Sequence, residues 1–119
     1  MFIQYIFPNK HSEERGFRIL VKHIILWQLK DDLSNEEKIS VKNGIKNGLE
    51  GLAGKIPGLT AISVVIDRLP SSNADVMLDS TFTDVDALKN YAVHPEHVAV
   101  ADRDVKPFTK SRLCLDFEI

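Results

Sequence analysis

The sequence predicts a single α+β domain of ferredoxin-like topology, in which a four-stranded antiparallel sheet carries helices on one side. Three observations predict this fold. The chain has 119 residues, which is the length of one domain. Its 44% hydrophobic and 27% charged residues are typical of a globular protein. Its segments of strand-like and helix-like periodicity follow one another in the order β-α-β-β-α-β.

The first predicted strand covers residues 20–30, where β-branched and aromatic residues dominate. Apolar residues occupy both of its faces, with Val21 and Ile25 on one and Ile24 and Leu26 on the other. A sheet with one solvated face would carry polar residues on that face instead. The chain is too short to cover both faces, so we expect a second copy to cover one of them.

A helix is predicted from Ser34 to Pro57-Gly58. Ser34 and Glu37 form a capping box, which satisfies free backbone donors at the start of the helix. Its apolar residues recur at helical spacing and are Val41, Ile45, Leu49, Leu52 and Ile56. Each glycine inside a helix costs about 1 kcal/mol relative to alanine. We therefore expect a close approach of the helix backbone to another surface at the three glycines, which are Gly44, Gly48 and Gly51.

A hairpin is predicted next. Strands over residues 60–68 and 75–82 alternate between apolar and polar positions, and the turn-rich segment 69–74 joins them. Leu78 lies on the same face of its strand as Val76.

The remaining part of the chain predicts two helices and a last strand. Thr83 is expected to cap the first helix, which ends at His94 because the residue before a proline avoids helical geometry. Pro95 can begin the second helix, which runs to about Lys106. Residues 112–119 alternate again and form the last strand.

Residues 1–19 are expected to be an extension and residues 20–119 the domain. The apolar run over residues 1–7 is too short to span a membrane and lacks the basic leader and cleavage site of a secretory signal. We therefore expect a soluble cytoplasmic protein. The apolar residues of the extension are expected to dock on an apolar groove of this subunit or its partner, and they are Phe2, Ile3, Tyr5 and Ile6.

Charge and cysteine content restrict the classes of partner. The net charge of −2 gives no electrostatic reason to expect nucleic acid or an anionic membrane as a partner. The single cysteine, Cys114, excludes an intrachain disulfide and fits a reducing compartment.

Four segments carry a resemblance to a known family. They are the opening residues 21–27 (VKHIILW), the helix over 34–58, the segment 91–97 with its His-Pro-Glu-His motif, and residues 115–118 (LDFE). In this order they resemble the stress-responsive A/B barrel (Dabb) family over residues 20–119. The resemblance implies a dimeric α+β barrel in which two four-stranded sheets pack face to face. Some plant members are linked to stress responses, and one branch contains plant polyketide cyclases.

The resemblance also implies a site. In the cyclase branch the histidine that matches His97 takes a proton from the substrate, and the tyrosine that matches Tyr91 hydrogen-bonds a substrate oxygen. The acid that matches Asp116 orients the histidine, and the histidine that matches His23 lines the pocket. Further residues expected at the ligand are Ile25, Trp27, Leu78 and Cys114.

The residues themselves support several readings of this site. His97 lies near a predicted helix start, which disfavours a positive charge, so a neutral imidazole able to act as a base is expected. His97 and His23 could equally be structural histidines, Tyr91 a core aromatic residue, and Asp116 the partner of a nearby donor. Cys114 is expected to be a buried, unreactive thiol.

A metal site is a further alternative. His94 and His97 are three residues apart, and Glu96 and Asp102 are near in sequence. Transition-metal sites need three or four converging ligands, however, and Pro95 is expected to turn His94 away. We therefore expect no metal and no cofactor.

These observations predict a homodimer that binds a small, largely apolar molecule between its helices and its sheet. The alternatives are a cofactor-independent cyclase or lyase with His97 as general base, and a stress-related dimer without a ligand. An open cavity that touches both His97 and Tyr91 would favour the enzyme. A His97–Asp116 contact sealed by packed side chains would favour the structural dimer, and an apolar cavity without a route to His97 would favour simple binding.

Overall fold

The computed structural model describes residues 19–119 and contains one antiparallel sheet. The order of its strands is β2-β3-β1-β4, and each neighbouring pair is antiparallel, which confirms the predicted ferredoxin-like topology. The strands are β1 (Val21–Leu29), β2 (Leu59–Val65), β3 (Val76–Phe82) and β4 (Thr109–Glu118). The docking expected for the N-terminal extension lies outside the described residues.

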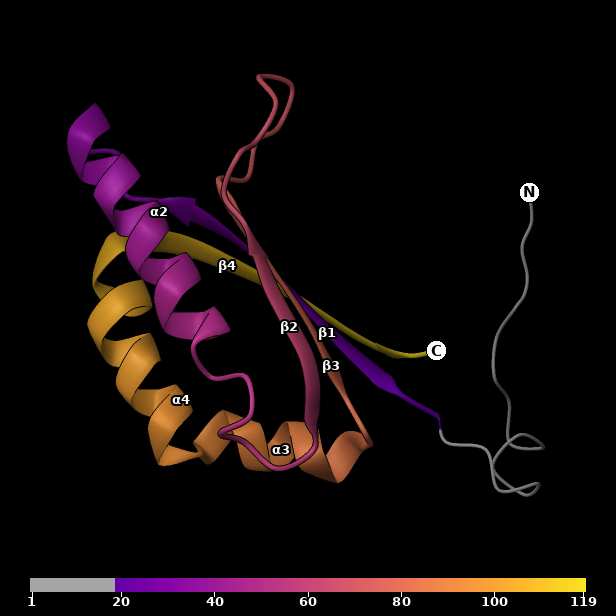
Figure 1. Ribbon diagram of the computed structural model, residues 1–119. Helices are drawn as coiled ribbons and strands as arrows, with labels where there is room; N and C mark the ends of the chain where they lie inside the picture. Colours follow the sequence, from indigo (N-terminus) through magenta and orange to yellow (C-terminus); the bar gives the residue numbers. More distant parts are fainter. Residues whose placement is uncertain (1–18) are drawn as a thin grey trace.

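The helical segments lie together on one side of the sheet, and in the described part of the chain no element covers the other side (Figure 1). None of these helices is both long and apolar enough to cross a membrane. They are α2 (Asn35–Glu50), α3 (Val85–Val93), α4 (Pro95–Val100), a π-helical segment (Ala101–Val105) and a short 3₁₀ turn (Lys106–Phe108).

The two faces of the sheet differ as the alternation in the first strand predicts. The residues of β1 that face the helices are all buried, and a hydrophobic core forms between them and α2. The other face remains apolar although Leu113 and Leu115 of β4 are 70% and 62% exposed. We call this surface the open face, and its large apolar residues are Ile24, Leu26, Val65, Met77, Leu113, Leu115 and Phe117.

The first helix starts where its capping box predicts and ends earlier than predicted. The Ser34 hydroxyl accepts a hydrogen bond from the Glu37 amide, and the Glu37 carboxylate accepts one from the Ser34 amide. The helix ends at Glu50 rather than at Ile56, because Gly51 caps it and Gly54 adopts a left-handed turn with φ of 78°. Ile56 is nevertheless buried, so this position is apolar because it packs into the core and not because it lies on a helix.

The cap of α3 also differs from the prediction. Asp84, not Thr83, is the N-cap residue, and its carboxylate accepts a hydrogen bond of 2.8 Å from the Ala87 amide. Asp84 has extended backbone geometry, as a cap residue requires, and its side chain reaches the amide three positions further on.

Close packing explains one of the three helix glycines. A Cβ atom on Gly48 would lie 2.8 Å from Val100 Cγ1 and 2.4 Å from Asp104 Oδ2, so α2 approaches α4 and the π-helical segment there. Gly44 has no such neighbour within 4 Å, and Gly51 meets only carbonyls of its own helix. The expected close approach is therefore right for Gly48 and wrong for the other two.

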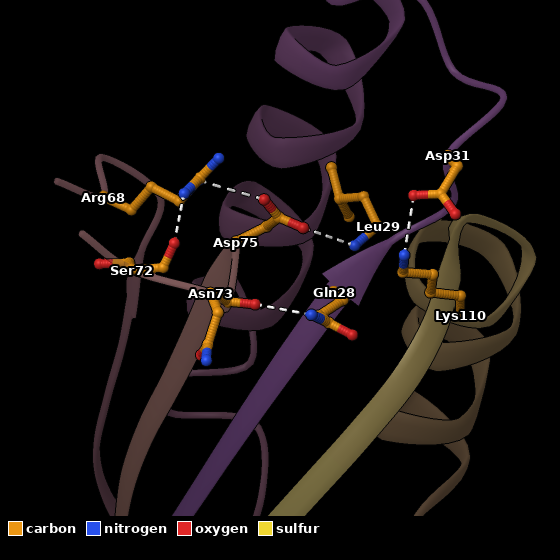
Figure 2. A network of polar contacts seen from close by, with 8 residues as sticks. All are labelled: Gln28, Leu29, Asp31, Arg68, Ser72, Asn73, Asp75 and Lys110. Carbon is orange, nitrogen blue, oxygen red and sulfur yellow. Dashed lines mark hydrogen bonds and ion pairs between the residues drawn. The ribbon is translucent and has the colours of Figure 1, made fainter. Parts of the chain in front are cut away.

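Hydrogen bonds of Asp75 fix the end of β1 (Figure 2). Its carboxylate accepts a 2.8 Å hydrogen bond from the Leu29 amide and pairs with Arg68 at 3.2 Å. Its own amide donates to the carbonyl of Trp27. This end of β1 and the loop before β3 are thereby held together, which keeps Trp27 in place on the helix-facing side.

The two glycines of α2 give a matched test of this packing. Gly44→Ala should raise the free energy of unfolding by about 1 kcal/mol, because alanine is the better helix former. Gly48→Ala should lower it by about 1–3 kcal/mol, because the new methyl group overpacks the contact with Val100. Urea unfolding of both variants measures the difference. An equal increase in the free energy of unfolding in both variants would contradict the close approach at Gly48.

Candidate functional site

A cavity of about 380 Å³ lies between the helices and the helix-facing side of the sheet. Small-molecule sites commonly have volumes of roughly 300–1,000 Å³ and mostly apolar walls. The apolar part of the wall consists of Ile25, Trp27, Leu49, Leu78, Leu88, Ala92, Ala101 and Val105. The polar part consists of His23, Tyr91, His97, Lys106, Thr109 and Arg112. The cavity therefore has the size and character of a small-molecule site.

The interruption between α3 and α4 at His94 brings two polar residues of this wall together. Pro95 follows His94, whose ψ angle of 132° ends α3 and starts α4 in a new direction. His94 is also the N-cap residue of α4, since its Nδ1 accepts a 3.1 Å hydrogen bond from the Glu96 amide. The rings of Tyr91 on α3 and His97 on α4 consequently lie with their centroids 4.0 Å apart.

Tyr91 carries an unsatisfied polar group. The side chain is 1% exposed, and its hydroxyl has no hydrogen-bond partner among the described residues. Burial raises the pKa of Tyr91, so the hydroxyl keeps its proton and can donate it in a hydrogen bond. A buried hydroxyl without a hydrogen-bond partner is uncommon and lowers the free energy of unfolding. Its presence here therefore requires an explanation.

The surroundings of His97 favour its neutral form. Its Nδ1 lies 3.4 Å from the carbonyl oxygen of Ala92. A carbonyl can only accept, so Nδ1 carries the proton of the neutral ring and the lone pair remains on Nε2. Burial lowers the pKa of His97, the hydrogen bond to the Ala92 carbonyl partly opposes this, and the nearby His23, Lys106 and Arg112 lower the pKa further. The expected neutral imidazole is thus explained by burial more than by the helix end.

Asp116 does not orient His97. In the pairing of β1 with β4 it lies opposite His23, and its Oδ1 accepts a 2.5 Å hydrogen bond from His23 Nδ1. The Cys114 thiol also donates to this oxygen, at 3.4 Å. The resemblance implied a contact between Asp116 and His97. The structure differs because the register of β1 with β4 places Asp116 opposite His23 instead.

Cys114 lies at the edge of the site rather than in its wall. Together with Asp116 and Arg112 it lines an adjoining groove, and it is exposed instead of buried. Partial burial and the hydrogen bond to Asp116 raise the pKa of the thiol, which favours its protonated form. Of the other residues expected at the ligand, the wall of the cavity contains His23, Ile25, Trp27 and Leu78.

The structure does not group the residues considered for a metal. His94 uses its Nδ1 to cap the break and does not join His97 in a ligand set. Among the described residues the arrangement nearest to a metal site is His23, Cys114 and Asp116. There the Asp116 oxygen already accepts hydrogen bonds from both neighbours, which accounts for the cluster without an ion.

Two cationic wall residues, Lys106 and Arg112, did not emerge from the sequence as site residues. The alternation of the last strand contained a signal for one of them, since Arg112 shares its face with Cys114 and Asp116. Lys106 lies in a 3₁₀ turn after a π-helical segment, and no sequence periodicity marks that geometry.

Comparison with known proteins relates the chain to one family. Residues 21–119 match the family model described as the stress responsive A/B barrel domain. A stress-response A/B barrel domain-containing protein of Arabidopsis thaliana is 28% identical over 99 residues, which are 82% of this chain and 36% of that protein. The chain thus spans about a third of the length of this curated relative.

Solved structures show the same fold. A dimeric protein of unknown function with a ferredoxin-like fold from Bacteroides fragilis is 39% identical, with a TM-score of 0.79 over 84% of this chain and 96% of that chain. The hydroxynitrile lyase from Passiflora edulis is 20% identical, with a TM-score of 0.64 over 84% of this chain and 93% of that chain. At that identity the likeness shows the fold alone.

The unpartnered hydroxyl of Tyr91 predicts an unusual effect on stability. Tyr91→Phe should raise the free energy of unfolding of the unliganded protein by about 1 kcal/mol, because it removes a buried polar group without a partner. Ser80→Ala is the matched control, since the buried Ser80 hydroxyl donates to the His23 carbonyl and its loss should destabilise by a similar amount. Urea unfolding compares the two. Equal destabilisation by both substitutions would show that the Tyr91 hydroxyl is bonded.

Proposed function

This chain belongs to the stress-responsive A/B barrel family, and from that membership we propose that its cavity binds a small, largely apolar molecule. One observation carries the proposal: the buried Tyr91 hydroxyl has no partner among the described residues and borders a largely apolar cavity. A ligand oxygen would supply the missing acceptor, and the cost of about 1–3 kcal/mol for an unsatisfied hydroxyl would be recovered on binding. The apolar wall would contribute roughly 25 cal/mol for each Å² of ligand surface removed from water.

A second candidate function is catalysis of proton transfer, and a specific observation favours it. The same cavity touches Tyr91 and His97, and no His97–Asp116 contact seals it, as a purely structural dimer would require. The neutral His97 Nε2 takes a proton from a carbon next to a carbonyl group. Tyr91 donates a hydrogen bond to the carbonyl oxygen, where negative charge develops. The resulting enolate carbon then attacks a second carbonyl carbon of the substrate, as in a cyclase. The π bond of that carbonyl opens to an alkoxide, which takes the proton back from His97.

The same two groups suit the reverse reaction. His97 takes the proton of a substrate hydroxyl, the adjacent carbon–carbon bond breaks, a carbonyl forms, and the released carbanion receives a proton. Neither direction requires a cofactor. The Passiflora edulis relative is a lyase by name, which supports this class of reaction only through the shared fold.

Dimer formation through the open face completes the proposal. The Bacteroides fragilis relative is described as dimeric, and the open face of this chain presents exposed Leu113, Leu115 and Phe117. Two open faces packed together would bury these side chains, and the helices would cover the outer sides of both sheets. The cavity would then lie within each subunit, away from the centre of the interface.

A probe ketone tests binding and catalysis together. Phenylacetone should bind to the cavity, and the wild type should accelerate exchange of its α-protons in D₂O, as followed by NMR. His97→Gln should reduce this rate by about 10²-fold, since general bases contribute that much or more, while binding persists. Tyr91→Phe should weaken binding of phenylacetone and slow the exchange. Lys55→Gln, an exposed change outside the cavity, is the control.

Either part of the proposal can fail in this experiment. If phenylacetone and related aromatic ketones perturb neither Tyr91 nor His97 signals, the cavity is not a ligand site of this kind. If His97→Gln retains the wild-type exchange rate, His97 is not the base and the enzyme reading fails.

The open face gives a separate prediction. Leu115→Glu should convert a dimer to a monomer, because it places charge in the middle of an apolar interface. Val93→Glu is the matched control, since Val93 is 74% exposed on α3, outside the open face. Native mass spectrometry measures the oligomeric state of both variants. A Leu115→Glu variant that remains dimeric would contradict the face-to-face arrangement.

A further inference from the structure

The charges of the cavity differ from those of the chain. The chain has 17 acidic and 15 basic residues and a net charge of −2. In the described part of the chain, the wall of the cavity contains Lys106 and Arg112 and no aspartate or glutamate. A largely apolar wall whose charged side chains are all cationic favours an anionic ligand over a neutral ligand of the same shape.

Arg112 is the cation that is available for a ligand. Among residues 19–119, no acidic side chain forms an ion pair with it, whereas Lys106 pairs with Asp102 at 3.2 Å. The Lys106–Asp102 pair is exposed, and such pairs contribute little, so Lys106 can turn toward a ligand. Asp116 and Glu118 line the adjoining groove with Arg112, and neither is within ion-pair distance of it, while the Oδ1 of Asp116 accepts hydrogen bonds from His23 and Cys114.

Arg112 lies where the cavity opens. In the strand pairing it stands opposite Trp27, and it lines both the cavity and the adjoining groove. Burial is the main cause that raises the pKa of Tyr91 and lowers that of His97, and the charge of Arg112 also acts on both groups. The guanidinium and the two candidate catalytic groups therefore share one space, within reach of a single small molecule.

We propose that the ligand of this cavity carries a carboxylate beside its apolar body, and that Arg112 binds this carboxylate at the opening with Lys106 beside it. The guanidinium of arginine offers a planar pair of donors that matches a carboxylate. The apolar body then extends inward toward Trp27 and Leu78, and its reactive oxygen meets Tyr91. This inference rests on the proposed function and names the class of molecule that the same site takes: small aromatic or aliphatic monocarboxylates.

Such a ligand has a consequence for the base. The charges of Lys106 and Arg112 disfavour the imidazolium form of His97. A bound carboxylate offsets these charges, so the pKa of His97 rises when the ligand is present. The imidazole is then a stronger base in the complex than in the free protein, which couples recognition of the carboxylate to the proposed proton transfer.

Two nearly isosteric probes test the inference. Phenylacetate and phenylacetamide differ in charge and little in shape. Calorimetry should give the wild type a preference of about 10-fold or more for phenylacetate, since charge-assisted hydrogen bonds are the stronger kind. Added salt should weaken the binding of the acid and leave that of the amide unchanged. In an NMR titration, bound phenylacetate should raise the pKa of His97, and phenylacetamide should leave it unchanged.

Variants assign the preference to Arg112. Arg112→Gln should lose most of the preference for phenylacetate and retain only the small part that Lys106 contributes. Arg112→Lys retains the charge without the paired donors and should keep part of the preference. The control Lys55→Gln makes the same change in net charge at an exposed position outside the cavity and should keep all of it.

The possible failures are distinguishable. Equal affinity of the wild type for both probes would overturn the carboxylate inference and leave the proposed apolar ligand site standing. A preference of undiminished size in Arg112→Gln would overturn the role of Arg112. If neither probe nor phenylacetone perturbs Tyr91 or His97, the proposed function fails, and this inference fails with it.

Discussion

The break at His94 is the constraint on which the site depends. In one continuous helix, residues six positions apart point about 120° away from each other and lie about 9 Å apart along the axis. Tyr91 and His97 are six positions apart, yet their ring centroids lie within 4.0 Å. Pro95 forces this arrangement by excluding helical geometry at His94, and the His94 side chain stabilises the break by capping the new helix. The close approach of the Tyr91 and His97 rings therefore depends on one proline and the capping residue before it.

The sheet supplies the other half of the site, and its two faces serve different purposes. On the helix-facing side of β1, His23, Ile25 and Trp27 are all buried and all border the cavity. The open face keeps apolar residues that a monomer would expose to water. At Tyr91 the fold accepts a buried hydroxyl without a partner among the described residues, which a purely structural core would replace with phenylalanine. This departure from the best packing is what a binding site requires.

Local patterns in the sequence predicted the strands, the capping box of α2 and the break at His94, because each depends on neighbouring residues. Two features depended on distant contacts and escaped such reasoning. The partner of Asp116 is set by the register of β1 with β4, 93 residues apart in sequence. The role of Gly48 depends on where Val100 and Asp104 pack, and nothing near Gly48 in sequence distinguishes it from Gly44. The end of α2 was overestimated because buried turn residues, Leu52 and Ile56, continued the helical spacing.

A crystal structure of the protein with phenylacetone bound tests the central claim most directly. The account predicts the ligand inside the cavity, with its carbonyl oxygen within hydrogen-bonding distance of the Tyr91 hydroxyl and its α-carbon near His97 Nε2. The aromatic ring should lie against Trp27 and Leu78. A structure in which side chains fill the cavity, the Tyr91 hydroxyl bonds to a protein atom and the ligand lies elsewhere would contradict it.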